Sequence, residues 1–242
     1  MRTKISIAIL AAGASIASPA YADMGANATL TNITVKLISL NGTTPWIYYT
    51  SGMTFTGEIN GNNMNYGGDF NINVTTATSY INASVQGSNN GANFPSSMTA
   101  NGSSIGTFNA SAQTLNVPFI LSADTVALFS ATGTAIVSGQ NNDRANAYAG
   151  LQVWGSNGDI QNASDALDAN YDYRSGYSGG GGGNTLTASF VNGNSGGTAN
   201  GDFLARTSIY GYAGAVPEPS EWALMASGLG IIGFMVRRKK SA

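Results

Sequence analysis

The stretch Ile33-Thr34-Val35-Lys36-Leu37 decides the fold class, because apolar and polar residues alternate in it with a period of two. Successive side chains of a β-strand point to opposite faces of the sheet, so this alternation predicts a strand with one buried face. The same alternation returns at 70–74, where Phe, Ile and Val are separated by two asparagines. The body of the chain is therefore expected to be all-β.

Further stretches of the same kind run along the chain, at 46–49, 79–85, 106–108, 114–121, 125–129, 134–137, 149–154, 185–191 and 203–212. Asn-Gly pairs lie between many of them, at 41–42, 60–61, 90–91, 101–102, 157–158 and 192–193. Asn-Gly favours positive φ at both central turn positions, which is typical of β-hairpins. We therefore expect a β-sandwich or jelly-roll-like domain with long Asn/Gly-rich loops.

Two stretches depart from the strand pattern. Between 158 and 172, Ala163, Leu167 and Tyr171 recur at i, i+4 and i+8, which predicts a short helix. The stretch 175–183 ends in five consecutive glycines and is expected to be a flexible loop.

The N-terminus has the three parts of a secretory signal in order. Arg2 and Lys4 form a basic segment, and a short, mostly apolar run follows at 5–14. Ala20 and Ala22 then place small residues at the positions that signal peptidase requires. We expect residues 1–22 to be removed by signal peptidase and residues 23–215 to be the exported domain.

The C-terminus has an ordered pattern of its own. Val216, Pro217, Glu218 and Pro219 precede an apolar run at 222–236, and a basic cluster ends the chain at Arg237, Arg238, Lys239 and Lys240. A helix of that length rises roughly 22 Å, which is shorter than the roughly 30 Å hydrocarbon core of a bilayer. The basic cluster should stay on the cytoplasmic side and stop transfer. Residues 216–242 are thus expected to anchor the body transiently in the inner membrane through a short transmembrane helix.

These C-terminal residues resemble the PEP-CTERM sorting signal. The resemblance rests on Pro217-Glu218-Pro219, the glycine-bearing apolar run and the terminal basic cluster. It implies that a membrane protease-transpeptidase, exosortase, recognises the Pro-Glu-Pro motif and releases the protein to the cell surface or matrix. Such proteins tend to occur in Gram-negative bacteria that make exopolysaccharide. The resemblance covers about 25 residues and says nothing about the role of the body.

Composition excludes several functional classes. The chain has no cysteine and no histidine. Ser-His-Asp and Cys-His catalysis therefore lack essential residues. Thiolate sites and the usual zinc sites lack their ligands. Charged residues are 9% of the chain, against roughly 25% in typical soluble domains. Residues 23–215 contain four basic and ten acidic side chains, a net charge of −6, which argues against nucleic-acid binding. We expect no cofactor and no metal.

Two carboxylate-based alternatives stay open. Glu58, the only glutamate of the body, could act with an aspartate as a glycosidase pair, although most residue types used in acid–base catalysis are absent. Asp165, Asp168 and Asp172 would share one face of a helix and could bind calcium. A solvated acidic face is the favoured interpretation of these aspartates.

Aromatic residues offer a sugar-binding alternative. Trp46 and Tyr48 would share one strand face, and so would Tyr210 and Tyr212. Exposed rings stack on the C–H faces of sugars, but the favoured interpretation is that these rings fill a core poor in aliphatic residues. Asn-x-Ser/Thr strings begin at eight asparagines and are weak indications of glycosylation: Asn27, Asn32, Asn41, Asn73, Asn82, Asn101, Asn109 and Asn162.

The sequence thus predicts a non-enzymatic, secreted surface or matrix protein associated with exopolysaccharide and biofilm. The first alternative is a carbohydrate-binding or adhesive module. The second is a carboxylate-based glycoside hydrolase.

Overall fold

A computed structural model describes residues 24–87, 94–139, 143–155, 163–172, 177–178, 181–213 and 227–230 of the chain. One compact unit spans Asp23–Gly214. Its described residues lie mostly in fifteen strands, and all the strand pairs among them are antiparallel. The all-β class expected from the alternation at 33–37 is confirmed.

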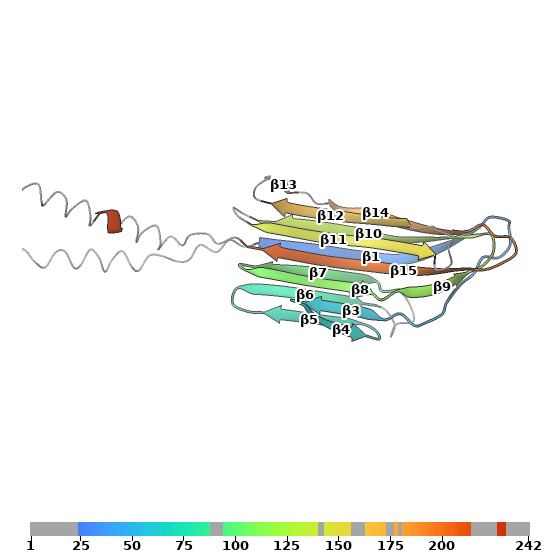
Figure 1. Cartoon of the computed structure of the whole chain (residues 1–242), viewed down its shortest axis with the longest axis horizontal. Helices are drawn as coiled ribbons and strands as arrows, with labels where there is room; N and C mark the ends of the chain where they lie inside the picture. The colour runs from blue at the N-terminus through green and yellow to red at the C-terminus, as the bar shows by residue number, and fades with distance from the viewer. Residues whose placement is uncertain are drawn as a thin grey trace, which may run out of the picture. The chain divides into compact units, whose positions relative to one another are not determined.

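The strands form two sheets (Figure 1). Sheet A has six strands in the spatial order β14 (Gly181–Asn192), β10 (Thr125–Ser138), β1 (Met24–Ser39), β7 (Ser97–Ser104), β6 (Ser79–Gln86) and β5 (Phe70–Thr75). The main path of sheet B runs β13 (Tyr177–Ser178), β12 (Ala163–Asp172), β11 (Arg144–Gly155), β15 (Ala199–Tyr212), β8 (Thr107–Thr114), β3 (Phe55–Ile59) and β4 (Asn62–Tyr66). In addition, β9 (Val117–Leu121) pairs with the start of β15, and β2 (Ile47–Tyr49) pairs with β9.

The two sheets pack face to face over one shared core. Phe129 of β10 stacks on Phe203 of β15 with ring centroids 4.6 Å apart, and Phe119 of β9 meets Phe190 of β14 edge-on at 5.2 Å. Both contacts join sheet A to sheet B. Full burial of one such side chain contributes about 1.5–3 kcal/mol, so these phenylalanines dominate a core otherwise rich in alanine.

A β-bulge divides β1 and changes which residues face the core. Before the bulge, the buried residues are even-numbered: Met24, Ala26, Ala28 and Leu30. Thr31 pairs with Thr132 but Thr34 pairs with Ser130, so two residues of β1 face one residue of β10. After this insertion the buried residue is Ile33, with Val35 and Leu37 partly buried. The bulge therefore keeps both halves of the strand directed into the same core.

The predicted helix within 158–172 is wrong where the structure describes it, because Ala163–Asp172 forms β12. This strand pairs with β11 along its length, with Leu167 opposite Ala149. A spacing of four residues is even, so Ala163, Leu167 and Tyr171 share one face of a strand as well as one face of a helix. The pairing partner, which the local pattern does not reveal, decides between the two.

The glycine tract is also partly a strand, against the expected flexible loop at 175–183. Tyr177–Ser178 forms β13, and β14 begins at Gly181, which pairs with Ala135 of β10.

Among the Asn-Gly pairs, Asn60-Gly61 forms the predicted hairpin turn between β3 and β4, with φ of 50° and 82°. The pair at 101–102 instead lies inside β7.

The predicted terminal helices lie almost wholly outside the described residues. These include the cleavage-site alanines Ala20 and Ala22, the motif 216–219 and the basic cluster 237–240. Residues 227–230 are helical. Within the described ranges, no helix has the length and apolar character that a membrane crossing requires.

Candidate functional site

The four aromatic residues singled out in the sequence all lie on the surface. Trp46 and Tyr48 are 47% and 60% exposed, and Tyr210 and Tyr212 are each 47% exposed. The interpretation that they fill the core is therefore wrong. Phenylalanine, alanine, leucine, isoleucine, valine and methionine fill the core instead.

The two aromatic pairs occupy opposite ends of the outer face of sheet B. Tyr48 lies opposite Ile120, which in turn lies opposite Asn200 at the start of β15. Tyr210 is ten residues farther along the same strand, or roughly 33 Å at the rise of a β-strand. The structure thus brings each pair together but does not join them into one row.

Charged and amide side chains surround the pair at 210–212. Across the β11–β15 ladder, Tyr210 lies opposite Asn146 and Tyr212 lies opposite Arg144. Arg144 forms an ion pair with Asp172 at 3.6 Å, and both side chains are nearly half exposed. An ion pair of this kind contributes roughly 0–1 kcal/mol. It chiefly makes this end of the outer face polar and charged.

The three aspartates considered for calcium do not share a face. Asp165 accepts a hydrogen bond of 2.9 Å from the Thr187 backbone N–H, and Asp168 accepts one of 2.6 Å from the Asn146 amide. Asp165 and Asp168 are three positions apart, an odd spacing, so they point to opposite faces of β12. No cluster of three potential metal ligands occurs among the described residues.

Asp168 and Asp202 of sheet B both lie too far from Glu58 to form a glycosidase pair with it. From Glu58 of β3, the register leads through Ser111, Ser208 and Tyr148 to Asp168 of β12. Four strand spacings separate the two carboxyl-bearing residues, or roughly 19 Å. Glycosidase carboxyl groups lie roughly 5–9.5 Å apart. Asp202, whose carboxyl pKa is raised by burial, is six residues along β15 from Ser208 and no closer to Glu58.

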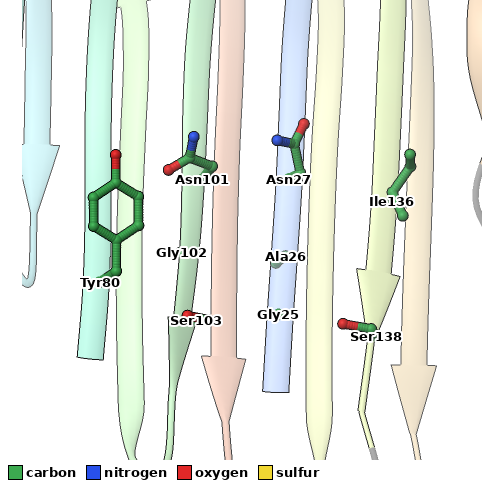
Figure 2. Close-up of a pocket in the computed structure, with 9 residues that line it drawn as sticks. All are labelled: Gly25, Ala26, Asn27, Tyr80, Asn101, Gly102, Ser103, Ile136 and Ser138. Atoms are coloured by element: carbon green, nitrogen blue, oxygen red, sulfur yellow. The ribbon is translucent and has the colours of Figure 1, made fainter. Parts of the chain in front are cut away.

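A groove of about 290 Å³ lies on the outer face of sheet A, where the sequence analysis placed no site (Figure 2). It crosses β6, β7, β1 and β10. One row of its lining is Tyr80, Ser103, Gly25 and Ser138, which lie opposite one another on these four strands. The neighbouring row contains Asn101, Asn27 and Ile136.

Asparagines from four Asn-x-Ser/Thr strings line up beside this groove. Asn73, Asn82, Asn101 and Asn27 are successive register partners across β5, β6, β7 and β1. In a strand, the Asn and the Ser or Thr of such a string share one face. Each string therefore indicates a polar strand face in the sequence. That the four faces lie side by side depends on the pairing of strands that are distant in the chain.

The outer face of sheet A is almost without charge. Among the outward-pointing residues of its described strands, Lys36 is the only ionisable side chain apart from Tyr80. Asn, Ser and Thr make up most of this face, for example Thr29, Thr99 and Thr134, which lie side by side. Such a surface exchanges hydrogen bonds with water or a neutral ligand, and it produces little long-range electrostatic field.

Comparison with family models, with curated proteins and with solved structures yields no match to this chain.

Proposed function

We propose that the chain is an exported, non-enzymatic surface or matrix protein whose body contacts exopolysaccharide. In this proposal, signal peptidase removes residues 1–22, and exosortase acts at Pro217-Glu218-Pro219 after the C-terminal helix has held the protein in the inner membrane. The observation that carries the proposal for the body is the almost uncharged Asn/Ser/Thr face of sheet A. Amides and hydroxyls of this kind can exchange hydrogen bonds with the hydroxyl groups of a polysaccharide.

The ends of the body support delivery by two terminal signals. The Cα of Gly211 lies so close to Met24 that an added Cβ would be 2.6 Å from the Met24 Cε atom. The first strand therefore starts beside the end of the last strand. The signal segment and the anchor segment are therefore joined to the body at the same end of the sandwich.

The proposal is tested by fractionating the native cells and measuring the intact mass of the protein. The expected product begins at Asp23, lacks Arg237–Lys240 and co-purifies with extracellular polysaccharide. A Glu218→Ala variant should remain in the membrane fraction with its basic cluster intact. A mature protein that keeps Arg237–Lys240, or a reporter fused after Ala242 that proves periplasmic, contradicts the sorting proposal.

A carbohydrate-binding or adhesive role is the second candidate, because the four singled-out aromatic residues are exposed and not part of the core. It predicts specific binding on a glycan array that is weakened in Trp46→Ala or Tyr212→Ala. Binding of no glycan by the intact protein argues for a purely structural role in the matrix. A glycosidase role would require turnover that disappears in Glu58→Gln.

A further inference from the structure

We infer that the groove on sheet A binds a short stretch of an uncharged polysaccharide, with Tyr80 and Ile136 as its apolar walls. This inference rests on the proposed contact with polysaccharide and gives it a location and a ligand class. The site is distinct from the aromatic residues that the sequence indicated on sheet B.

Gly25 creates the floor of the groove. Its row neighbours are Ser103 on β7 and Ser138 on β10, and a Cβ added at Gly25 would lie 2.8 Å from the Ser138 hydroxyl oxygen. Glycine in a strand interior is unfavourable for folding and often marks close approach of another molecule. Its missing side chain leaves space in the groove, among the lining residues whose positions Figure 2 shows.

The walls present apolar surface to the solvent. Tyr80 is 44% exposed and Ile136 is 50% exposed, although residues of these types are usually more buried. Three strand spacings separate them, or roughly 14 Å. A ring at one side and an aliphatic side chain at the other suit the C–H faces of sugar rings, and the separation leaves room for a short oligosaccharide.

Several polar groups of the groove have no hydrogen-bond partner among the described residues. One is the Asn101 Oδ1 atom, which is buried. An unsatisfied acceptor of this kind costs roughly 1–3 kcal/mol. The side chains of Asn27, Ser103 and Ser138 likewise make no hydrogen bond to the described residues. The groove therefore offers unpaired amide and hydroxyl groups that can donate hydrogen bonds to a ligand and accept them from it.

The absence of charge in the lining selects a neutral ligand. None of the nine lining residues is an acid or a base with a charge at neutral pH. Lys36 is nine residues from Asn27 along β1, or roughly 30 Å away, so it does not reach the groove. Anionic polysaccharides are bound through Arg or Lys, and no such residue lies here. We therefore expect neutral hexose polymers to bind in preference to uronic-acid polymers.

The test is affinity electrophoresis of the full chain in mild detergent, with dextran, mannan or laminarin as neutral probes and alginate as the anionic probe. Tyr80→Ala and Gly25→Val, which fills the floor, should each weaken binding of the neutral probe by about tenfold. Ile38→Ala is the control, since it removes an apolar residue of similar exposure from the far end of β1. This control should stay within about twofold of the unmodified chain, and Tyr210→Ala tests the alternative site on sheet B. Circular dichroism and thermal midpoints show whether each variant is folded, and Asn27→Ala replaces Gly25→Val if that variant does not fold.

Besides a complete lack of binding, three results would overturn the inference: tighter binding of alginate, equal binding by the unmodified chain and Tyr80→Ala, or loss of binding only in Tyr210→Ala. The last result would transfer the glycan site to sheet B and leave the proposed function intact. If the unmodified chain binds no neutral polymer, the groove inference fails. Cell fractionation then decides the sorting proposal separately.

Discussion

The side-chain amide of Asn192 donates a hydrogen bond of 3.2 Å to the backbone carbonyl of Leu121. Asn192 is the last residue of β14 in sheet A, and Leu121 is the last residue of β9 in sheet B. The same amide nitrogen also lies 2.9 Å from the carbonyl oxygens of Ser122 and Gly197. One buried side chain thus connects the ends of the two sheets, and its two N–H groups are shared among three backbone acceptors.

Replacing Asn192 should weaken the fold. In Asn192→Leu, the carbonyl groups of Leu121, Ser122 and Gly197 lose their shared donor, and the first two belong to buried residues. We expect the free energy of unfolding to fall by about 2–3 kcal/mol. Denaturant titration measures the change, and Asn200→Ala at an exposed position of β15 serves as the control. Equal stability of Asn192→Leu and Asn200→Ala would show that water replaces the amide.

The bulge residue Asn32 should tolerate glycine but not valine. Its φ is 54°, a left-handed conformation that asparagine and glycine adopt and that β-branched residues avoid. Asn32→Val should lower the free energy of unfolding by about 1–2 kcal/mol, whereas Asn32→Gly should change it little. Paired denaturant titrations of the two variants test this. A valine variant as stable as the glycine variant would mean that β1 loses its bulge without cost.

Tyr49 should make the protein less stable in alkali. Its hydroxyl is buried without a hydrogen-bond partner in the part of the chain that the structure describes, and burial raises the pKa of the phenol well above its ordinary value. The folded state therefore keeps the proton that the unfolded state loses above about pH 10, so the free energy of unfolding falls as pH rises beyond that value.

Tyr49→Phe isolates this effect, because it removes the hydroxyl and keeps the ring that meets Phe94 edge-on at 5.6 Å. At neutral pH the variant should be more stable by about 1 kcal/mol, since an unsatisfied buried group is removed. Its advantage should grow above about pH 10. Tyr48→Phe, at a residue that is 60% exposed, is the control. If the free energy of unfolding fell with pH equally in the unmodified chain and in Tyr49→Phe, the Tyr49 phenol would not be the cause of the alkaline instability.

Gly201 should be intolerant of alanine. The ring of Phe119 occupies the space that a Cβ at Gly201 would need, with the Phe119 Cε2 atom 2.8 Å from that position. Overpacking of this kind costs about 1–3 kcal/mol, and Phe119 has little freedom because it also meets Phe129 and Phe190. Thermal unfolding of Gly201→Ala should show the loss. Gly193→Ala, where no atom lies within 4 Å of the new Cβ, should match the unmodified chain.

Local sequence was sufficient where a feature depends on neighbouring residues. The alternation at 33–37 and 70–74 predicted β-strands, and Asn60-Gly61 predicted its hairpin, because strand period and positive φ are properties of a few consecutive residues. The same reasoning failed for 163–172, where an even spacing fits a helix and a strand equally well. It also missed β4, whose residues 62–66 carry only one aromatic and one methionine.

The sequence by itself determined the all-β class, the exclusion of histidine and cysteine chemistry, and the expectation of sorting signals at both ends. Only the tertiary structure decided which face each side chain occupies: the four singled-out aromatic rings lie outside the core, and Asn27, Asn101 and Tyr80 meet around Gly25. Those residues come from strands far apart in the chain, and their meeting depends on strand register. Register is determined by packing of the whole sandwich, so no local pattern contains it.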